Sequence, residues 1–174
     1  MGKSPFPVLD AQRYSGTRDA LHAYSRILGG WAKACRTRRK HWWHASLRPS
    51  LAGVTTGVIY ADVDFEIELN FRASALQVST AVGESMQAEL TGQPAGELAT
   101  RVGEFLESVG VSLRPDATAS QLDSAQSFSG YSPMEADGLA RALSAVSAAL
   151  TDFRAGVPEE TSPSLLLRHR VSLA

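Results

Sequence analysis

Apolar and polar residues alternate with two different periods along the chain, and these periods predict its helices and strands. Apolar residues recur every three or four positions from residue 17 to residue 35, which is the spacing of one helix face. From residue 41 to residue 90 the period is two, as in strands with one buried face. The clearest run is residues 62–71, in which Phe65, Ile67, Leu69 and Phe71 alternate with Glu66, Glu68 and Asn70. The other predicted strands are residues 41–48, 54–60, 75–82 and 84–90.

Two further helices are predicted after the strands. One follows Pro94 and ends at Gly110, a residue type that is common just beyond a helix C-terminus. The other has Ser132 as N-cap, Pro133 in its first turn and Gly156 beyond its last turn. The chain is therefore expected to have an α+β fold, with an antiparallel meander of four to five strands and about three helices packed on one face.

The segments outside these elements complete the predicted organisation. Residues 1–16 form an irregular lead-in, because Pro5 and Pro7 oppose regular structure. Residues 17–174 form a single domain. Within it, the polar segment 112–130 is expected to be a long loop, and segment 162–174 is expected to be a last strand.

Composition excludes some classes of protein and favours others. The 174 residues are 44% hydrophobic with a net charge of −1, so the chain as a whole does not attract phosphates or anionic lipids. No apolar stretch has the roughly 18 residues that a membrane span needs, and the N-terminus lacks a signal-peptide core. A cytoplasmic protein without membrane contact is expected. The one cysteine, Cys35, is interpreted as a small core residue, with a nucleophile as the less favoured alternative because Arg36 and His22 could lower its pKa.

A candidate site follows if residues 41–48, HWWHASLR, form a strand. Trp43 and Leu47 would then enter the core. The opposite face of the sheet would carry a polar group that the next strands extend, namely Trp42, His44, Arg48, Glu66, Glu68 and Asn70.

These residue types suit a small-molecule site of unknown substrate. A carboxylate of Glu66 or Glu68 would raise the pKa of His44 and orient its ring, as general acid–base catalysis requires. Trp42 would form a flat platform for a ligand, and Arg48 and Asn70 would bind it. The simpler interpretation is that all six are ordinary outward residues of an antiparallel sheet. Whether the domain is an enzyme stays open, and no cofactor is indicated.

Three different hypotheses place other functions in the same region. The face could be a protein-interaction surface that binds a partner chain or a second copy. The basic residues Arg36–Lys40, with Arg48 and two tryptophans, could bind single-stranded nucleic acid, although the nearly neutral overall charge argues against this as the main role. A metal site at His41 and His44 is disfavoured, because residues three apart on a strand point to opposite faces.

Several segments resemble an uncharacterised bacterial family of the DUF5996 type. The matching segments are Ala20–Tyr24, Lys40–His44 with its HWWH motif, Gly53–Thr56, Phe65–Phe71, Ser129–Glu135 and Ser162–Pro163. Members of this family are longer, and they carry His, Trp and Asp where this chain has Leu165, Arg168 and Ser172. The resemblance implies that this chain shares the fold and the site location of the family. It also implies that this chain is a short form in which part of the family site is changed. It implies no particular activity.

Overall fold

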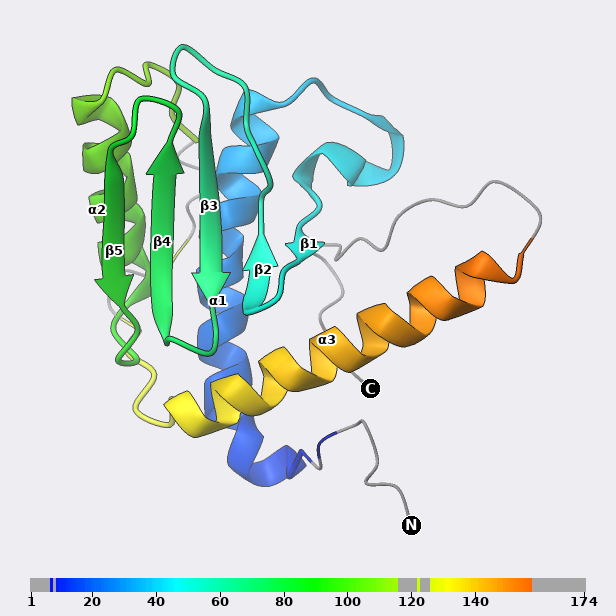
Figure 1. Ribbon diagram of the computed structural model, residues 1–174. Helices are drawn as coiled ribbons and strands as arrows, with labels where there is room; N and C mark the ends of the chain where they lie inside the picture. The colour runs from blue at the N-terminus through cyan, green and yellow to red at the C-terminus, as the bar shows by residue number, and fades with distance from the viewer. Residues whose placement is uncertain (1–6, 8, 116–121, 123–125, 158–174) are drawn as a thin grey trace.

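The computed structural model describes residues 7, 9–115, 122 and 126–157, and Figure 1 shows their arrangement. The elements follow the chain in the order α1 (Ala11–Cys35), a 3₁₀ helix η1 (Lys40–Ala45), β1 (Arg48–Pro49), β2 (Gly53–Thr55), β3 (Phe65–Asn70), β4 (Ala75–Thr80), β5 (Ser85–Glu89), α2 (Ala95–Ser108) and α3 (Pro133–Ala155). The predicted α+β class is confirmed. The predicted last strand at 162–174 lies outside the described residues.

The sheet is an antiparallel meander of five strands in the order β1-β2-β3-β4-β5. Phe65, Ile67 and Leu69 of β3 are buried, while the residues between them are half-buried, as the period of two predicts. β4 pairs with β3 over six residues, from Phe65 opposite Thr80 to Asn70 opposite Ala75. The predicted strand at 54–60 is shorter than expected, since only Gly53–Thr55 and an isolated bridge at Ile59 pair with the sheet.

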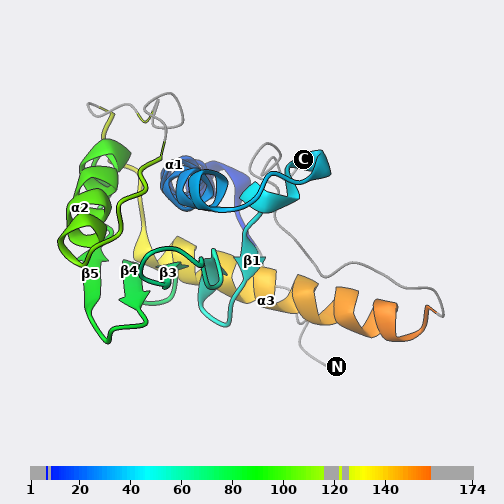
Figure 2. The same ribbon diagram turned by 90° about the horizontal axis from the view of Figure 1, so that it is seen from above.

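Helices α1 and α2 lie side by side on one face of the sheet, which Figure 2 shows from above. Tyr24, Leu28 and Trp31 of α1 are buried there, and the indole of Trp31 meets the ring of Phe65 edge-on at 5.6 Å. The hydroxyl of Tyr24 donates a hydrogen bond of 2.8 Å to the carbonyl of Gln93. No helix of the described part of the chain covers the opposite face of β3, β4 and β5 (Figure 1).

Among the described residues, helix α3 buries side chains in its first half. Its buried residues are Ala136, Gly138, Leu139 and Ala140, and beyond them the helix extends past the sheet edge (Figure 1). The Ser132 N-cap is confirmed, since its hydroxyl oxygen accepts the backbone N–H of Glu135. The helix ends before Gly156, as predicted.

Helix α1 begins six residues earlier than the sequence suggested, because Asp10 caps it. The carboxylate of Asp10 accepts the backbone N–H groups of Gln12 and Arg13. Gly16 therefore lies inside the helix, and a Cβ there would meet the backbone of Gly130 at 2.8 Å. This glycine serves a close approach between two segments and does not mark the start of the helix.

The prediction that residues 41–48 form a strand is wrong. Lys40–Ala45 is a 3₁₀ helix, and only Arg48 and Pro49 pair with the sheet. Side chains replace the ladder bonds that a strand would have made: the guanidinium of Arg36 donates to the carbonyls of His44 and Thr56, and the hydroxyl of Ser46 donates to the carbonyl of Trp43 at 2.7 Å. These bonds fix the segment in a tight turn.

Candidate functional site

The two neighbouring tryptophans do not point to opposite sides of a β-layer. Both lie on η1 and both are partly exposed, Trp42 by 44% and Trp43 by 46%. His44 is buried, and its ring stacks on the indole of Trp42 with the centroids 5.7 Å apart. The predicted core position of Trp43 and the predicted outward position of His44 are therefore both wrong, because a 3₁₀ helix does not alternate its side chains.

Glu66, Glu68 and Asn70 share the open face of β3, as predicted, but each bonds to a neighbour. Glu66 accepts the hydroxyl of Thr55 at 2.5 Å, and Glu68 accepts the hydroxyl of Ser50 at 2.6 Å. The side-chain oxygen of Asn70 accepts the backbone N–H of Ala73. The structure does not bring any of the three to His44, so the expected imidazole–carboxylate pair is not formed among the described residues.

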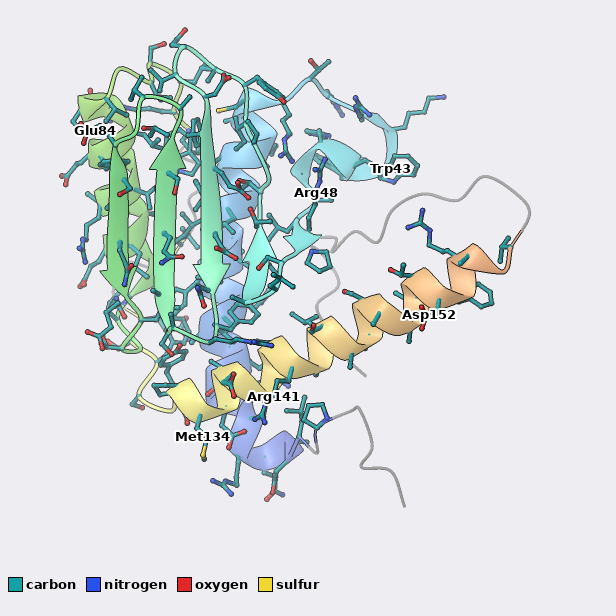
Figure 3. The ribbon with its side chains drawn as sticks, viewed as in Figure 1. Trp43, Arg48, Glu84, Met134, Arg141 and Asp152 are labelled. Carbon is teal, nitrogen blue, oxygen red and sulfur yellow. The ribbon has the colours of Figure 1, made fainter. Side chains whose placement is uncertain are left out.

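Arg48 and His44 do come together, in a cavity of about 530 Å³ between the end of α1, η1 and β1. Figure 3 shows Arg48 at the β1 edge of the sheet and Trp43 on the neighbouring η1. The lining residues are Cys35, Arg36, Thr37, Arg39, Trp43, His44, Ser46, Arg48, Val58 and Tyr60. We call this the arginine cavity.

The charged side chains that line the arginine cavity are all cationic among the described residues. Three guanidinium groups line it, and no Asp or Glu is among the described residues that do. Burial lowers the pKa of Arg36, and the nearby charge of Arg48 lowers it further. Arg36 is anchored by its two backbone acceptors, whereas Arg48 is exposed and has no acceptor among the described residues. Its guanidinium passes over Gly57, at 3.3 Å from where a Cβ would lie.

The hydrogen bonding of His44 assigns its ring nitrogens. Nδ1 lies 3.2 Å from the backbone nitrogen of Arg39, whose N–H can only donate, so Nδ1 acts as an acceptor and carries no proton. In this arrangement Nε2 is the ring nitrogen left to donate a hydrogen bond. His44 thus presents a hydrogen-bond donor to its surroundings, where the sequence had suggested a general base.

Cys35 also reaches the arginine cavity, but it does not have the character of an activated nucleophile. Burial raises the pKa of its thiol, and the opposing effect of Arg36 is smaller. A thiol with a raised pKa stays protonated near neutral pH and is a poor nucleophile. The interpretation of Cys35 as a packing residue is the one that its surroundings favour.

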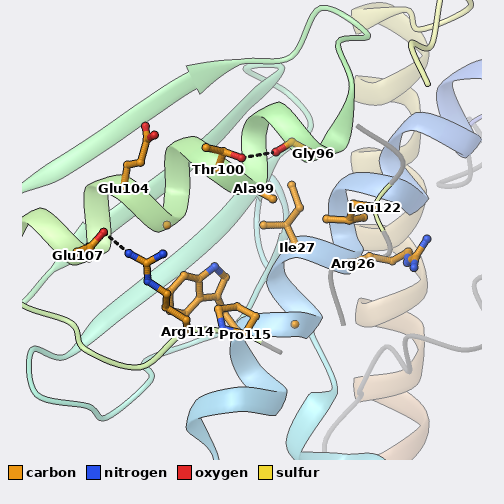
Figure 4. A pocket seen from close by; sticks show the side chains of 13 residues that line it. Arg26, Ile27, Gly96, Ala99, Thr100, Glu104, Glu107, Arg114, Pro115 and Leu122 are labelled. Carbon is orange, nitrogen blue, oxygen red and sulfur yellow. Dashed lines mark hydrogen bonds and ion pairs between the residues drawn. The ribbon is translucent and has the colours of Figure 1, made fainter. Parts of the chain in front are cut away.

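A second cavity, of about 610 Å³, lies between α1 and α2 and was not foreseen from the sequence. Figure 4 shows Ile27, Ala99 and Leu122 among its walls. Its charges have both signs, and Arg114 is ion-paired with Glu107 at its rim. A cavity whose charges already compensate one another offers less to an ionic ligand than the arginine cavity does.

Neither a membrane-spanning helix nor a metal cluster occurs in the described part of the chain. No helix there is long and apolar enough to cross a membrane. No group of three or more His, Cys, Asp or Glu residues that could hold a metal ion is found within the same ranges.

Comparison with known proteins gives the relationship of the chain but not its role. No curated protein and no solved structure matches it. A family model described as a family of unknown function, DUF5996, matches residues 6–174, which is nearly the whole chain. The protein therefore belongs to the DUF5996 family.

Proposed function

We propose that the protein binds a small organic anion in the arginine cavity. The observation that carries this proposal is the set of three guanidinium groups, those of Arg36, Arg39 and Arg48, in a cavity whose described lining has no carboxylate. Like charges held together in a partly dry site raise the free energy of the empty protein, and a bound anion would remove that cost. Guanidinium groups also match the two oxygens of a carboxylate or phosphate.

The remaining lining residues favour a ligand with an apolar or aromatic body. Val58, Trp43 and Tyr60 are exposed at the arginine cavity, with Tyr60 exposed by 77%. Exposing large apolar side chains to water is unfavourable in free energy, and a ligand that covers them removes that cost. Aromatic rings also stack well on planar ligands. An aromatic carboxylate or an aryl phosphate has the required combination of a flat body and a charged end.

The contacts of His44 support a binding role better than a role in acid–base catalysis. A general base needs an unprotonated nitrogen directed at the substrate, but the unprotonated nitrogen of His44 is used by the N–H of Arg39. The Nε2–H group can instead donate to an anionic oxygen. Glu66 and Glu68, proposed from the sequence as catalytic partners, are bonded to Thr55 and Ser50 and do not line the cavity.

The proposal is tested by calorimetric titration with benzoate and phenyl phosphate. Arg48→Gln removes the exposed guanidinium, and His44→Gln replaces the imidazole with another neutral donor. Arg101→Gln, on the exposed surface of α2, is the matched control. We expect Arg48→Gln to weaken binding about tenfold or more, the worth of one charge-assisted hydrogen bond, and Arg101→Gln to leave it unchanged. Absence of binding to both probes at millimolar concentration, or equal loss in both arginine variants, overturns the proposal.

A further inference from the structure

A smaller cavity lined by cations lies near the arginine cavity, and we call it the lysine cavity. It has a volume of about 360 Å³, and its lining consists of Arg38, Arg39, Lys40 and Trp42. Arg39 therefore lines both cavities. The rings of Trp42 and His44 stack on each other, and Trp42 lines one cavity while His44 lines the other. The two cavities are thus separate but neighbouring, and cations line both.

Trp42 contacts one cation that lines the lysine cavity, Arg38, and one that lies beside it, Lys33. The ammonium of Lys33 lies 5.5 Å from the centre of the indole, and the guanidinium carbon of Arg38 lies 5.8 Å from it. Cations at this distance from a ring face are attracted to it, which restricts long side chains that would otherwise move freely. The backbone of Trp42 has a φ of 61°, a conformation that is rare for an aromatic residue and that directs the indole toward these cations.

No ion pair joins the positive charges that line the two cavities to an acid among the described residues. The ion pairs between described residues, such as Arg18 with Asp19 and Arg141 with Asp137, lie elsewhere in the molecule. Asp62 acts on Cys35 from a distance, but its carboxylate accepts the hydroxyl and N–H of Ser112. Because the net charge of the chain is −1, this concentration of cations is a local feature and not a reflection of a basic protein.

We infer that the ligand of the arginine cavity carries a chain of two or three phosphates that continues past Arg39 into the lysine cavity. The inference rests on the proposed anion site and specifies its ligand. One carboxylate or phosphate would satisfy the guanidiniums of Arg36 and Arg48 but would leave Arg38 and Lys40 without an anion. A phosphate chain extends over several ångströms with a charge on each unit, which fits a row of cations better than one compact anion does. With an aromatic body against Trp43 and Tyr60, the ligand class is a nucleoside diphosphate or triphosphate.

The test compares four probes with the full chain, namely phenyl phosphate, ADP, ATP and inorganic tripolyphosphate. We expect affinity to rise at least tenfold from phenyl phosphate to ATP. Tripolyphosphate should bind more weakly than ATP, because it lacks the aromatic body. Tripolyphosphate binding as tightly as ATP would identify a site for inorganic polyphosphate and overturn the nucleotide assignment.

A double variant, Arg38→Gln with Lys40→Gln, separates this inference from the proposed function. Both side chains are exposed, so the fold should persist, and far-ultraviolet circular dichroism checks this. We expect a loss of about tenfold for ATP and no change for phenyl phosphate. Equal affinity of phenyl phosphate and ATP for the native protein refutes the phosphate chain while leaving the anion site intact. Tighter binding of a ten-residue thymidine oligonucleotide than of ATP would refute it in favour of a single-stranded nucleic acid.

Discussion

Replacing Arg48 by Gln should stabilise the empty protein while weakening its binding of anions. Arg48 is exposed and makes no hydrogen bond or ion pair among the described residues, so its removal loses little. Its charge acts unfavourably on Arg36, which is half-buried and holds the turn of η1 through the carbonyls of His44 and Thr56. Because water screens an exposed charge, we expect a gain on the order of 0.5 kcal/mol.

Adding ligand should reverse the order of stability of the native protein and the Arg48→Gln variant. At a concentration of 100 Kd, phenyl phosphate should stabilise the native protein by about 2.7 kcal/mol. If Arg48→Gln binds ten times more weakly, the same concentration stabilises the variant by only about 1.4 kcal/mol. The variant should therefore be more stable than the native protein without ligand, and less stable by roughly 0.8 kcal/mol with it.

Urea denaturation followed by tryptophan fluorescence measures both differences. With a slope of about 2 kcal/mol per molar urea, the midpoint of the empty variant should shift upward by roughly 0.2 M. Half-molar sodium chloride should remove most of this shift, because it screens the repulsion between the two guanidiniums. Arg101→Gln should show neither the shift nor the reversal. A variant that is less stable than the native protein in the absence of ligand, at low salt, would refute the electrostatic reasoning.

Four further predictions concern the fold and the cavity. Tyr24→Phe should lower the free energy of unfolding by about 1 kcal/mol in urea titrations, because the carbonyl of Gln93 loses its donor in a partly buried site. Gly53→Ala should cost more than about 2 kcal/mol or abolish folding, as judged by circular dichroism, because the new Cβ would lie 2.1 Å from the carbonyl oxygen of Leu69. Ser132→Ala should cost about 1 kcal/mol in the same titrations through loss of the α3 cap. Trp43→Phe should remove most of the change in fluorescence that phenyl phosphate causes, since Trp43 lines the cavity, Trp31 is buried, and Trp42 senses the ligand only through His44, on which its ring stacks; an unchanged response would place the ligand elsewhere.

The elements that the sequence predicts well are those whose hydrophobic period is long and regular. β3 alternates without exception from Phe65 to Asn70, and the pattern can be satisfied only by a strand with one buried face. Helix α3 has a capping serine, a proline in the first turn and a terminal glycine, so its two ends are both marked locally. In these segments the local preference and the tertiary structure agree.

The turn at residues 40–45 could not be predicted in the same way, because its conformation is set by distant groups. A period of two over a few residues does not distinguish a strand from a short 3₁₀ helix when tryptophan and histidine can be buried or exposed in either. The choice depends on Arg36 reaching Thr56, a partner 20 residues away. No local sequence pattern predicts a side-chain contact between residues so far apart in the chain.

The candidate site is predictable in part. The sequence places Arg48 and His44 in one site, and the two residues do line one cavity. Val58 and Tyr60 fall in a predicted strand, and Arg36 falls at the end of a predicted helix, so no local pattern joins the three residues. A usable signal is present in the cluster from Arg36 to Lys40, which has no acidic residue within it. Unbalanced cations of this kind require either solvent or an anion.

The position of Arg36 links the stability of the turn to the occupancy of the cavity. Its guanidinium donates to two carbonyls, of His44 and Thr56, and so connects η1 to the segment that follows β2. The same group lines the arginine cavity, where burial and the charge of Arg48 lower its pKa. An anion in the cavity would offset the repulsion between Arg36 and Arg48, which opposes the position of Arg36 between the two segments. Protection of the amides in residues 40–46 against hydrogen exchange should increase when phenyl phosphate binds, since the turn cannot open without withdrawing Arg36 from the ligand.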